Sequence, residues 1–224
     1  MKNVYLSIFI LTNSILVFCQ TSPNKEKLFV PNGKVALIGY GSLMSIASME
    51  KTLGHTYTDK FIPIHINGFE RVWNLGIPNN GTLVPSLFYY VMAGDTIFSK
   101  QLVFLNIQEN RKKSMNACLF IIDTVELKKF DEREIGYKRI RLNSQIKEFE
   151  IVGGDVFAYI GLPTFTIKTT DDPKDNVIFR HYIKLVEEDS LLALGEQFRN
   201  EYYLTTLPYS PKILMTIKSK PIKK

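Results

Sequence analysis

Runs of apolar residues, and stretches in which apolar and polar residues alternate, predict the strands of this chain. Residues 34–43 and 114–123 are almost continuously apolar over strand length, which is typical of a strand buried on both faces. Residues 61–76 alternate in their first half, as a strand does, with a turn signal at Asn67-Gly68. Further strand-like segments are 83–92, 100–107, 137–143 and 153–162, of which the first two also fit a variable insertion.

Helical spacing marks three other parts of the chain. Residues 45–54 read as a short helix, with Ser45 as its N-cap and Gly54 as its stop. A second helix is expected just after Thr124, and 179–203 reads as two helices. Strands and helices therefore alternate irregularly. This order predicts a single α+β domain built on a small, barrel-like twisted β-sheet with surrounding helices.

The helix after Thr124 contains an unexpected carboxylate. Thr124 is the expected N-cap, and Gly136 is placed to end the helix in a left-handed conformation. At ~100° per residue, Leu127, Phe130 and Glu134 share one stripe, whereas neighbours such as Arg133 point elsewhere. Burying an unpaired charge is costly. A glutamate on the buried stripe therefore needs an explanation.

The first residues resemble a targeting segment rather than part of the fold. Lys2 precedes an apolar run from Val4 to Phe18, which is short for a membrane span. This pattern predicts a secretory signal peptide at 1–19 and an exported protein, either periplasmic or extracellular. The alternative is a lipoprotein with a lipid anchor on Cys19, although Phe18 is bulky for the position before such a cysteine.

Charge and cysteine content argue against nucleic-acid binding and against a reactive cysteine. The net charge is +6, but five lysines lie in 212–224, and residues 20–211 hold equal numbers of basic and acidic residues. We therefore expect a solvated basic tail at 206–224 and no nucleic-acid binding. Cys118 is the one cysteine left after cleavage, so no intramolecular disulfide is possible, and its apolar surroundings predict a buried, inert thiol.

Residues 39–43, Gly-Tyr-Gly-Ser-Leu, follow a buried strand and precede a helix. Such a turn exposes backbone N–H groups, and its glycines let a ligand approach the backbone closely. The motif lacks the lysine of a P-loop and the third glycine of a dinucleotide fingerprint. By itself the motif is a weak signal, and it favours a tight strand–helix turn over an anion-binding site.

Other chemical motifs are weak. His55, His65 and His181 are far apart and have no partner at metal-ligand spacing, so surface or satisfied histidines are expected. The acidic loop 171–175 lacks the ligand spacing of a calcium site. The serine-hydrolase pattern G-x-S-x-G does not occur.

Taken together, the loop at 39–43, the segment 67–74 and the segment 130–139 resemble the gamma-glutamylcyclotransferase family in their order. The family's Tyr-Gly-Ser-Leu loop is matched by Tyr40, Gly41, Ser42 and Leu43. Its catalytic glutamate is matched by Glu134, in the context Phe-Asp-Glu-Arg-Glu. Some branches of the family have an asparagine where Leu43 stands.

Two tyrosines extend the resemblance. Tyr137 matches a tyrosine that follows the family's catalytic glutamate, and Tyr182 matches an aromatic residue at the head of a late helix. The resemblance covers 34–205 and is poor over 77–113. It implies a gamma-glutamylcyclotransferase-like fold in this range, and a small-molecule gamma-glutamyl substrate.

The reaction that the resemblance implies is intramolecular. The α-amine of the substrate attacks its own γ-carbonyl, which yields 5-oxoproline and a released amine. Glu134 would be the general base, and residues 40–43, Tyr137 and Tyr182 would bind the substrate. The resemblance implies no metal and no cofactor.

Three alternatives stay open at this point. The same fold is compatible with a non-catalytic module that binds a small ligand, or with a different acyl-transfer or hydrolytic enzyme. Glu134 is also compatible with a structural role as the partner of a buried arginine, for which Arg71 and Arg139 are the candidates.

Overall fold

The computed structural model describes residues 25–222. Its main sheet has seven strands, and β6 is central because it pairs with β2, β3 and β10. The strand order is β11-β10-β6-β2-β9-β7, with β3 paired to β6 outside this path. The strands are β2 (Lys34–Gly39), β3 (Ile62–Pro78), β6 (Gln101–Asp123), β7 (Tyr137–Arg141), β9 (Val156–Gly161), β10 (Asn176–Phe179) and β11 (Leu214–Met215).

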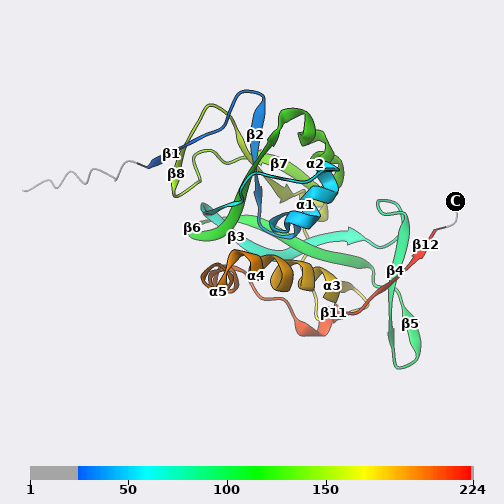
Figure 1. Ribbon diagram of the computed structural model, residues 1–224. Coiled ribbons are helices and arrows are strands. Elements are labelled where there is room, and N and C mark those ends of the chain that lie inside the picture. The colour runs from blue at the N-terminus through cyan, green and yellow to red at the C-terminus, as the bar shows by residue number, and fades with distance from the viewer. Residues whose placement is uncertain (1–24, 223–224) are drawn as a thin grey trace, which may run out of the picture.

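The longest pairing joins β3 and β6 in an antiparallel ribbon. Its register shifts between Asn67 and Phe69 and again between Trp73 and Leu75. Shifts of this kind bend a strand and increase its twist. The ribbon therefore curves across the molecule (Figure 1).

Helices lie on both faces of the central strands. They are α1 (Ile46–Leu53), α2 (Leu127–Arg133), α3 (Arg180–Ile183), α4 (Leu191–Leu194) and α5 (Glu196–Thr205), with a π-helical segment at Lys184–Ser190 between α3 and α4. Figure 1 shows α1 and α2 on one side of the β3–β6 ribbon and α3 to α5 on the other. Mixed strands and helices confirm the predicted α+β class.

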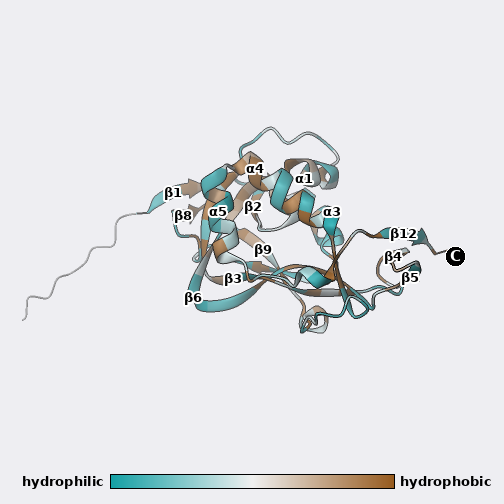
Figure 2. Ribbon diagram, turned by 90° about the horizontal axis from the view of Figure 1, so that it is seen from below, coloured by the Kyte–Doolittle hydropathy of each residue, from teal (hydrophilic) through white to brown (hydrophobic). Residues whose placement is uncertain are grey.

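Alternation along β2 explains this layering. Val35 and Leu37 pack into a hydrophobic cluster with α1 and α2, whereas Ala36 and Ile38 pack into a second cluster that includes α3 to α5. Successive side chains of a strand point to opposite faces, so a strand buried on both faces is apolar throughout. Figure 2 shows hydrophobic residues where the helices meet the central strands.

A small three-stranded sheet projects from the body as an arm (Figure 1). It consists of β4 (Ser86–Met92), β5 (Asp95–Ile97) and β12 (Lys218–Pro221), in the order β12-β4-β5. A further two-stranded sheet joins β1 (Glu26–Phe29) to β8 (Phe149–Val152). The uncertain segments at 83–92 and 100–107 are thus the arm strand β4 and the first part of β6.

The C-terminal segment is solvent-exposed at β12, as expected of a solvated tail, but it also pairs with other strands. Within 206–222, β11 pairs in parallel with β10, and β12 pairs antiparallel with β4. Backbone hydrogen bonds hold these strands, and they need no apolar side chains. A lysine-rich sequence therefore forms an edge strand, which is also where lysine is common.

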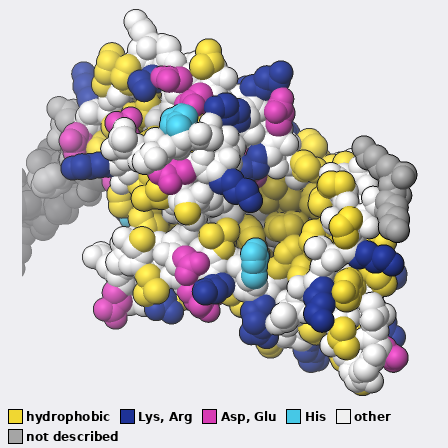
Figure 3. Space-filling model, turned by 45° about the vertical axis from the view of Figure 1, so that its right-hand side comes forward, with side chains coloured by type: hydrophobic (Ala, Val, Ile, Leu, Met, Phe, Trp, Pro, Cys, Tyr) yellow, Lys and Arg dark blue, Asp and Glu magenta, His cyan; other side chains and the backbone are white. Residues whose placement is uncertain are grey.

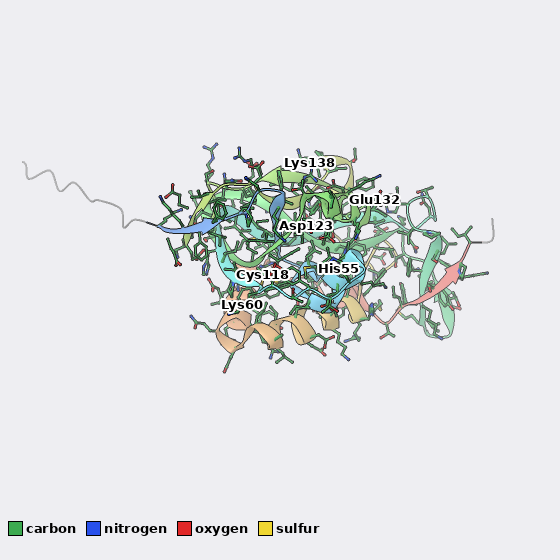
Figure 4. All side chains as sticks on the ribbon, turned by 45° about the horizontal axis from the view of Figure 1, so that its top comes forward. His55, Lys60, Cys118, Asp123, Glu132 and Lys138 are labelled. Atoms are coloured by element: carbon green, nitrogen blue, oxygen red, sulfur yellow. The ribbon has the colours of Figure 1, made fainter. Side chains whose placement is uncertain are left out.

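The helix that leads to Glu134 differs from prediction at both ends. Asp123, not Thr124, is the N-cap, and with Glu126 it forms a capping box over a 3₁₀ turn that continues into α2. The helix ends at Arg133, because Glu134 leaves helical geometry with a ψ of 61°. Gly136 has a φ of +85° and serves the following turn instead. Figure 4 labels Asp123, where β6 runs into this segment.

The predicted signal peptide at 1–19 and Cys19 lie outside the described residues. Across residues 25–222, the structure contains no helix with the length and apolar character of a membrane span.

Candidate active site

The loop 40–43 follows β2 and turns at once into a 3₁₀ helix at Ser42–Met44 and then into α1. Ser45 caps α1 as predicted, because its hydroxyl accepts a hydrogen bond from the Ser48 amide at 3.2 Å. A Cβ on Gly39 would lie 2.6 Å from the Leu43 carbonyl oxygen, so only glycine permits this turn. The tight turn brings the backbone of 40–43 to one end of the sheet.

Arg71 supports this loop from inside the protein. Its side chain is fully buried, and its Nε donates to the Tyr40 carbonyl at 2.8 Å. The guanidinium also donates to the Asn116 carbonyl and to the Thr206 hydroxyl, and it lies 4.2 Å from the centre of the Tyr202 ring. A buried guanidinium needs such partners, so Arg71 links the loop to β6 and α5.

Glu134 lies directly after α2, and 13% of its side chain is exposed. Burial raises the pKa of its carboxyl to about 7, although the Arg133 guanidinium acts in the opposite direction. The carboxyl therefore exchanges its proton near neutral pH. That is the range in which a general base is most effective.

Arg133 is the partner of Glu134, and sequence reasoning missed it. Its Nε lies 3.2 Å from Glu134 Oε1. Its terminal nitrogens donate to the hydroxyls of Ser42 at 3.0 Å, Ser48 at 2.9 Å and Thr52 at 2.6 Å. We expected this side chain to point away from the buried stripe. The helix end instead directs it toward α1, where it connects the loop, α1 and the carboxylate.

The arginines expected as structural partners of Glu134 are engaged elsewhere. Arg71 supports the loop, as described above. Arg139 forms an ion pair with Asp131 at 2.7 Å on the surface. That part of the alternative interpretation is wrong.

Three tyrosines enclose the carboxylate. Tyr137 donates its hydroxyl hydrogen to the Leu105 carbonyl, and the ring of Tyr182 packs edge-on against Trp73 and Phe104. Tyr159, which sequence reasoning did not single out, donates to Asp131 at 2.8 Å. Burial raises the pKa of all three phenols, so they are neutral hydrogen-bonding groups at pH 7.

All seven residues singled out from the sequence line one small cavity of about 20 Å³, which we call the inner pocket. They are Tyr40, Gly41, Ser42, Leu43, Glu134, Tyr137 and Tyr182. Ile38, Leu105 and Tyr159 complete its wall. The loop 40–43 and Glu134 therefore line the same cavity.

A second cavity of about 200 Å³, the outer pocket, adjoins the first, because Ser42, Glu134, Tyr137 and Tyr182 line both. Its remaining residues are Leu75, Ile77, Val84, Phe104, Arg133 and Ile135. Glu134 thus lies at the junction of a polar cavity and a more apolar one.

A separate groove of about 490 Å³ lies between the arm and α3. Its floor includes Phe88, Phe179 and Ile217, and His181 is among its polar residues. Figure 3 shows a hollow with a hydrophobic floor and basic side chains around it beside the arm. The groove contains none of the residues expected to bind substrate.

The other residues considered for catalysis or metal binding have structural roles. His65 is hydrogen-bonded to Glu148 and to Glu201, each at 2.5 Å, so it is a satisfied histidine as predicted. Cys118, labelled in Figure 4, is buried, and burial raises the pKa of its thiol to about 12. Within residues 25–222, no cluster of three or more His, Cys, Asp or Glu side chains is arranged to hold a metal ion.

Comparison with solved structures identifies the fold. A structure described as gamma-glutamyl cyclotransferase superposes with a TM-score of 0.51 and 11% identity, over 80% of this chain and 93% of the other. The chain has the gamma-glutamyl cyclotransferase fold. YkqA from Bacillus subtilis matches this fold with a TM-score of 0.52 and 14% identity, over 79% of this chain and 56% of YkqA, so the chain spans about half the length of that protein.

An uncharacterized human protein shares the gamma-glutamyl cyclotransferase fold, with a TM-score of 0.50 and 12% identity over 81% of this chain and 94% of its own. No family model and no curated protein sequence matches the chain. The likeness is therefore one of fold. It agrees with the resemblance seen in the sequence motifs.

Proposed function

We propose that this protein is a gamma-glutamyl cyclotransferase, which converts a gamma-glutamyl amide to 5-oxoproline and releases the amine. The observation that carries this proposal is the position of Glu134. A carboxyl with a pKa near 7 shares one small cavity with the backbone of the loop 40–43. The fold supports the same class of reaction.

The first step is proton removal. The substrate's α-amine has a pKa of roughly 8 or above, so most of it is protonated at neutral pH. The Glu134 carboxylate accepts one proton from this ammonium group. Each unit by which the pKa of the amine exceeds that of Glu134 costs about 1.4 kcal/mol, so raising the pKa of Glu134 to about 7 lowers the cost of the transfer.

In the second step the ring closes, because the deprotonated α-amine now has a free lone pair on its nitrogen. The amine nitrogen bonds to the γ-carbon, and the carbonyl electrons move to its oxygen. The tetrahedral intermediate collapses as the bond from the γ-carbon to the leaving nitrogen breaks. Protonated Glu134 gives its proton to that nitrogen. The new ring nitrogen still carries two hydrogens, and the Glu134 carboxylate removes one of them to leave the neutral lactam. Glu134 passes this second proton to the released amine, which leaves as an ammonium ion. The nucleophile is part of the substrate, so holding it in the correct geometry supplies much of the rate enhancement.

The loop and the tyrosines provide polar groups for this path. Gly41, Ser42, Leu43 and Tyr182 line the inner pocket and carry backbone N–H groups and a phenolic O–H. Tyr137 also lines it, but its hydroxyl hydrogen is donated to the Leu105 carbonyl. N–H and O–H donors at such positions stabilise a developing oxyanion or bind a carboxylate. Arg133 holds Ser42 and Glu134 in a fixed relation, because it contacts both.

The test is product analysis on a panel of gamma-glutamyl peptides and amines. Mass spectrometry should detect 5-oxoproline and the free amine in equal amounts. Free glutamate in place of 5-oxoproline would indicate a hydrolase. Binding of the panel without any product would indicate a binding module.

The predicted targeting segment gives a separate proposal, that the protein is exported. Residues 1–19 should be absent from the mature chain. Intact-mass measurement on protein from the native host checks this. Retention of Met1 would contradict export, and an added lipid on Cys19 would support the lipoprotein alternative.

A further inference from the structure

The groove between the arm and α3, which we call the arm groove, has a volume of about 490 Å³. This volume is larger than that of the inner and outer pockets together, and it falls within the range of roughly 300–1,000 Å³ that is typical of small-molecule sites. The arm groove shares no lining residue with either pocket. The chemistry proposed for Glu134 therefore leaves the arm groove without a role.

The floor of the arm groove is apolar and comes from three parts of the chain. Phe88 lies on β4, Phe179 ends β10, and Ile217 lies between β11 and β12. The rings of Phe88 and Phe179 pack with their centroids 5.2 Å apart. All three side chains are half-buried, so part of their apolar surface still faces solvent. A ligand with an apolar body would gain free energy by covering this surface.

One wall of the arm groove is an exposed stripe of α3 and of the π-helical segment after it. Arg180, His181, Lys184 and Glu188 recur at helical spacing, line the groove and are exposed. Tyr182, between them in sequence, lines the inner and outer pockets instead. The same helical turn therefore serves two separate cavities.

The charge of the arm groove is predominantly positive. Lys218, the first residue of β12, joins Arg180 and Lys184 in its lining, and Glu188 is the single carboxylate there among residues 25–222. None of the ion pairs within these residues includes Arg180, Lys184 or Lys218. Figure 3 shows basic side chains around the hydrophobic floor. An anion placed there would meet three cations that have no acidic partner in the described chain.

Another cavity of the protein shows that this arrangement is not general. A cavity of about 590 Å³ beside β7 is also lined by basic residues, but each of them pairs with an aspartate at 2.6 to 3.1 Å. These residues are Lys34, Arg139 and Arg141. Their charges are compensated within the fold, whereas those of the arm groove are not.

We propose that the arm groove binds a small anionic amphiphile, a molecule with an apolar alkyl or aryl body and one carboxylate. The body lies on the apolar floor, and the carboxylate faces Arg180 and Lys184. A cationic ligand would meet like charge, and a small hydrophilic anion would leave the floor exposed. This binding does not involve Glu134, so it goes beyond the proposed cyclotransferase activity.

The experiment is calorimetric titration of the full chain with monomeric alkyl carboxylates from butanoate to decanoate. Affinity should rise with chain length, by up to about fourfold per added methylene. The neutral analogue 1-octanol should bind about tenfold or more weakly than octanoate, because it lacks the charge. Equal affinities for octanoate and 1-octanol, or affinity independent of chain length, would overturn the proposal.

A pair of double variants tests the position of the carboxylate. Arg180→Gln with Lys184→Gln should weaken octanoate binding by about tenfold or more and leave 1-octanol binding unchanged. Lys51→Gln with Lys128→Gln is the matched control. It removes the same charge from exposed residues of α1 and α2 that do not line the groove. Equal losses of octanoate affinity in both double variants would indicate a net-charge effect and contradict the site.

A change in the floor tests the position of the apolar body. Ile217→Ser should weaken octanoate and 1-octanol alike, by up to about tenfold. Cooperative thermal unfolding of this variant shows that it is folded. Unchanged affinity for both ligands in the folded variant would contradict contact with the floor.

Two further measurements exclude other occupants and other sites. Arg133→Met removes the cation of the outer pocket and should leave octanoate affinity unchanged. Octanoate binding that is lost in this variant but kept in the Arg180 and Lys184 double variant would place the ligand in the outer pocket and overturn the proposal. Sedimentation with phosphatidylglycerol vesicles, in the absence of any octanoate binding, would assign the groove to a membrane surface instead.

The outcome is separable from that of the proposed function. Glu134→Gln should bind octanoate with wild-type affinity, because Glu134 does not line the arm groove. Octanoate binding without 5-oxoproline formation would sustain this inference and sink the proposed activity. Formation of 5-oxoproline by a protein that does not bind octanoate would do the reverse.

Discussion

Among single residues, Glu134 matters most to the proposed mechanism, through the ionisation of its carboxyl. The pKa of its carboxyl rises from 4.5 to about 7 because the group is largely buried. The folded state therefore binds a proton more tightly than the unfolded state does. Ionised Glu134 destabilises the fold, and the destabilisation grows as pH rises from about 4.5 and is complete above about 7.

Replacement of the carboxyl by an amide should remove this pH dependence. Above pH 7 Glu134→Gln should be more stable than the wild-type protein, by at most roughly 3 kcal/mol less the lost Arg133 contact. The advantage should shrink as pH falls through 7 toward 4.5. Thermal unfolding of both proteins from pH 4 to 9 measures it. A variant that is less stable at pH 8 would mean that Glu134 is a structural partner of Arg133.

At the scale of elements, the site depends on the contact between α1 and the end of α2. The patterns of α1, including its caps at Ser45 and Gly54, were predictable because capping is local. The inward position of Glu134 followed from helical periodicity. The role of Arg133 did not follow from periodicity. It depends on where α2 ends and on the contacts of the Arg133 side chain with the neighbouring helix α1.

Removal of the Arg133 charge should change the pH profile of the reaction. The Arg133 guanidinium lowers the pKa of Glu134, so Arg133→Met should move the acidic limb of kcat/KM to higher pH. Arg133→Lys keeps the charge and should shift the limb less. Both variants lose contacts to Ser42, Ser48 and Thr52, at a cost of about 1–3 kcal/mol in stability.

Arg139→Met provides the control for this pair. Arg139 forms its ion pair with Asp131 at the surface. Its removal should leave the acidic limb in place. An unchanged limb in Arg133→Met as well would show that Arg133 does not tune the carboxyl.

In the whole molecule, the C-terminal segment connects the arm to the body, because β11 pairs with β10 of the main sheet and β12 pairs with β4 of the arm. β12 pairs with β4, and a Cβ on Gly81 would lie 1.7 Å from the Ile222 side chain. Sequence patterns did not predict this, because Lys218 to Pro221 carry no apolar alternation and pair through backbone alone. The length of the β3–β6 ribbon was not predicted from the sequence either. Strand pairing is non-local, and bulges interrupt the alternation of apolar and polar residues along each strand.

Truncation after Met215 should therefore loosen the arm selectively. β4 would lose its partner strand, and β11 would remain. Hydrogen exchange should become faster in β4 and β5 and should stay slow in the central part of β6. Exchange that is unchanged in the arm would contradict a structural role for β12. Faster exchange throughout β6 would show that the segment stabilises the whole fold.

The proposed mechanism requires Glu134 to transfer the proton in 5-oxoproline formation, and the Glu134→Gln variant removes this ability alone. The matched control is Glu132→Gln, two residues earlier in α2, where the side chain is 67% exposed. Glu132 is labelled in Figure 4. At pH 7.5, 5-oxoproline formation should fall by about 10²–10⁴ in Glu134→Gln and remain at the wild-type rate in Glu132→Gln. Both variants should melt as cooperatively as the wild-type protein. A folded Glu134→Gln protein that forms 5-oxoproline at the wild-type rate would contradict the mechanism.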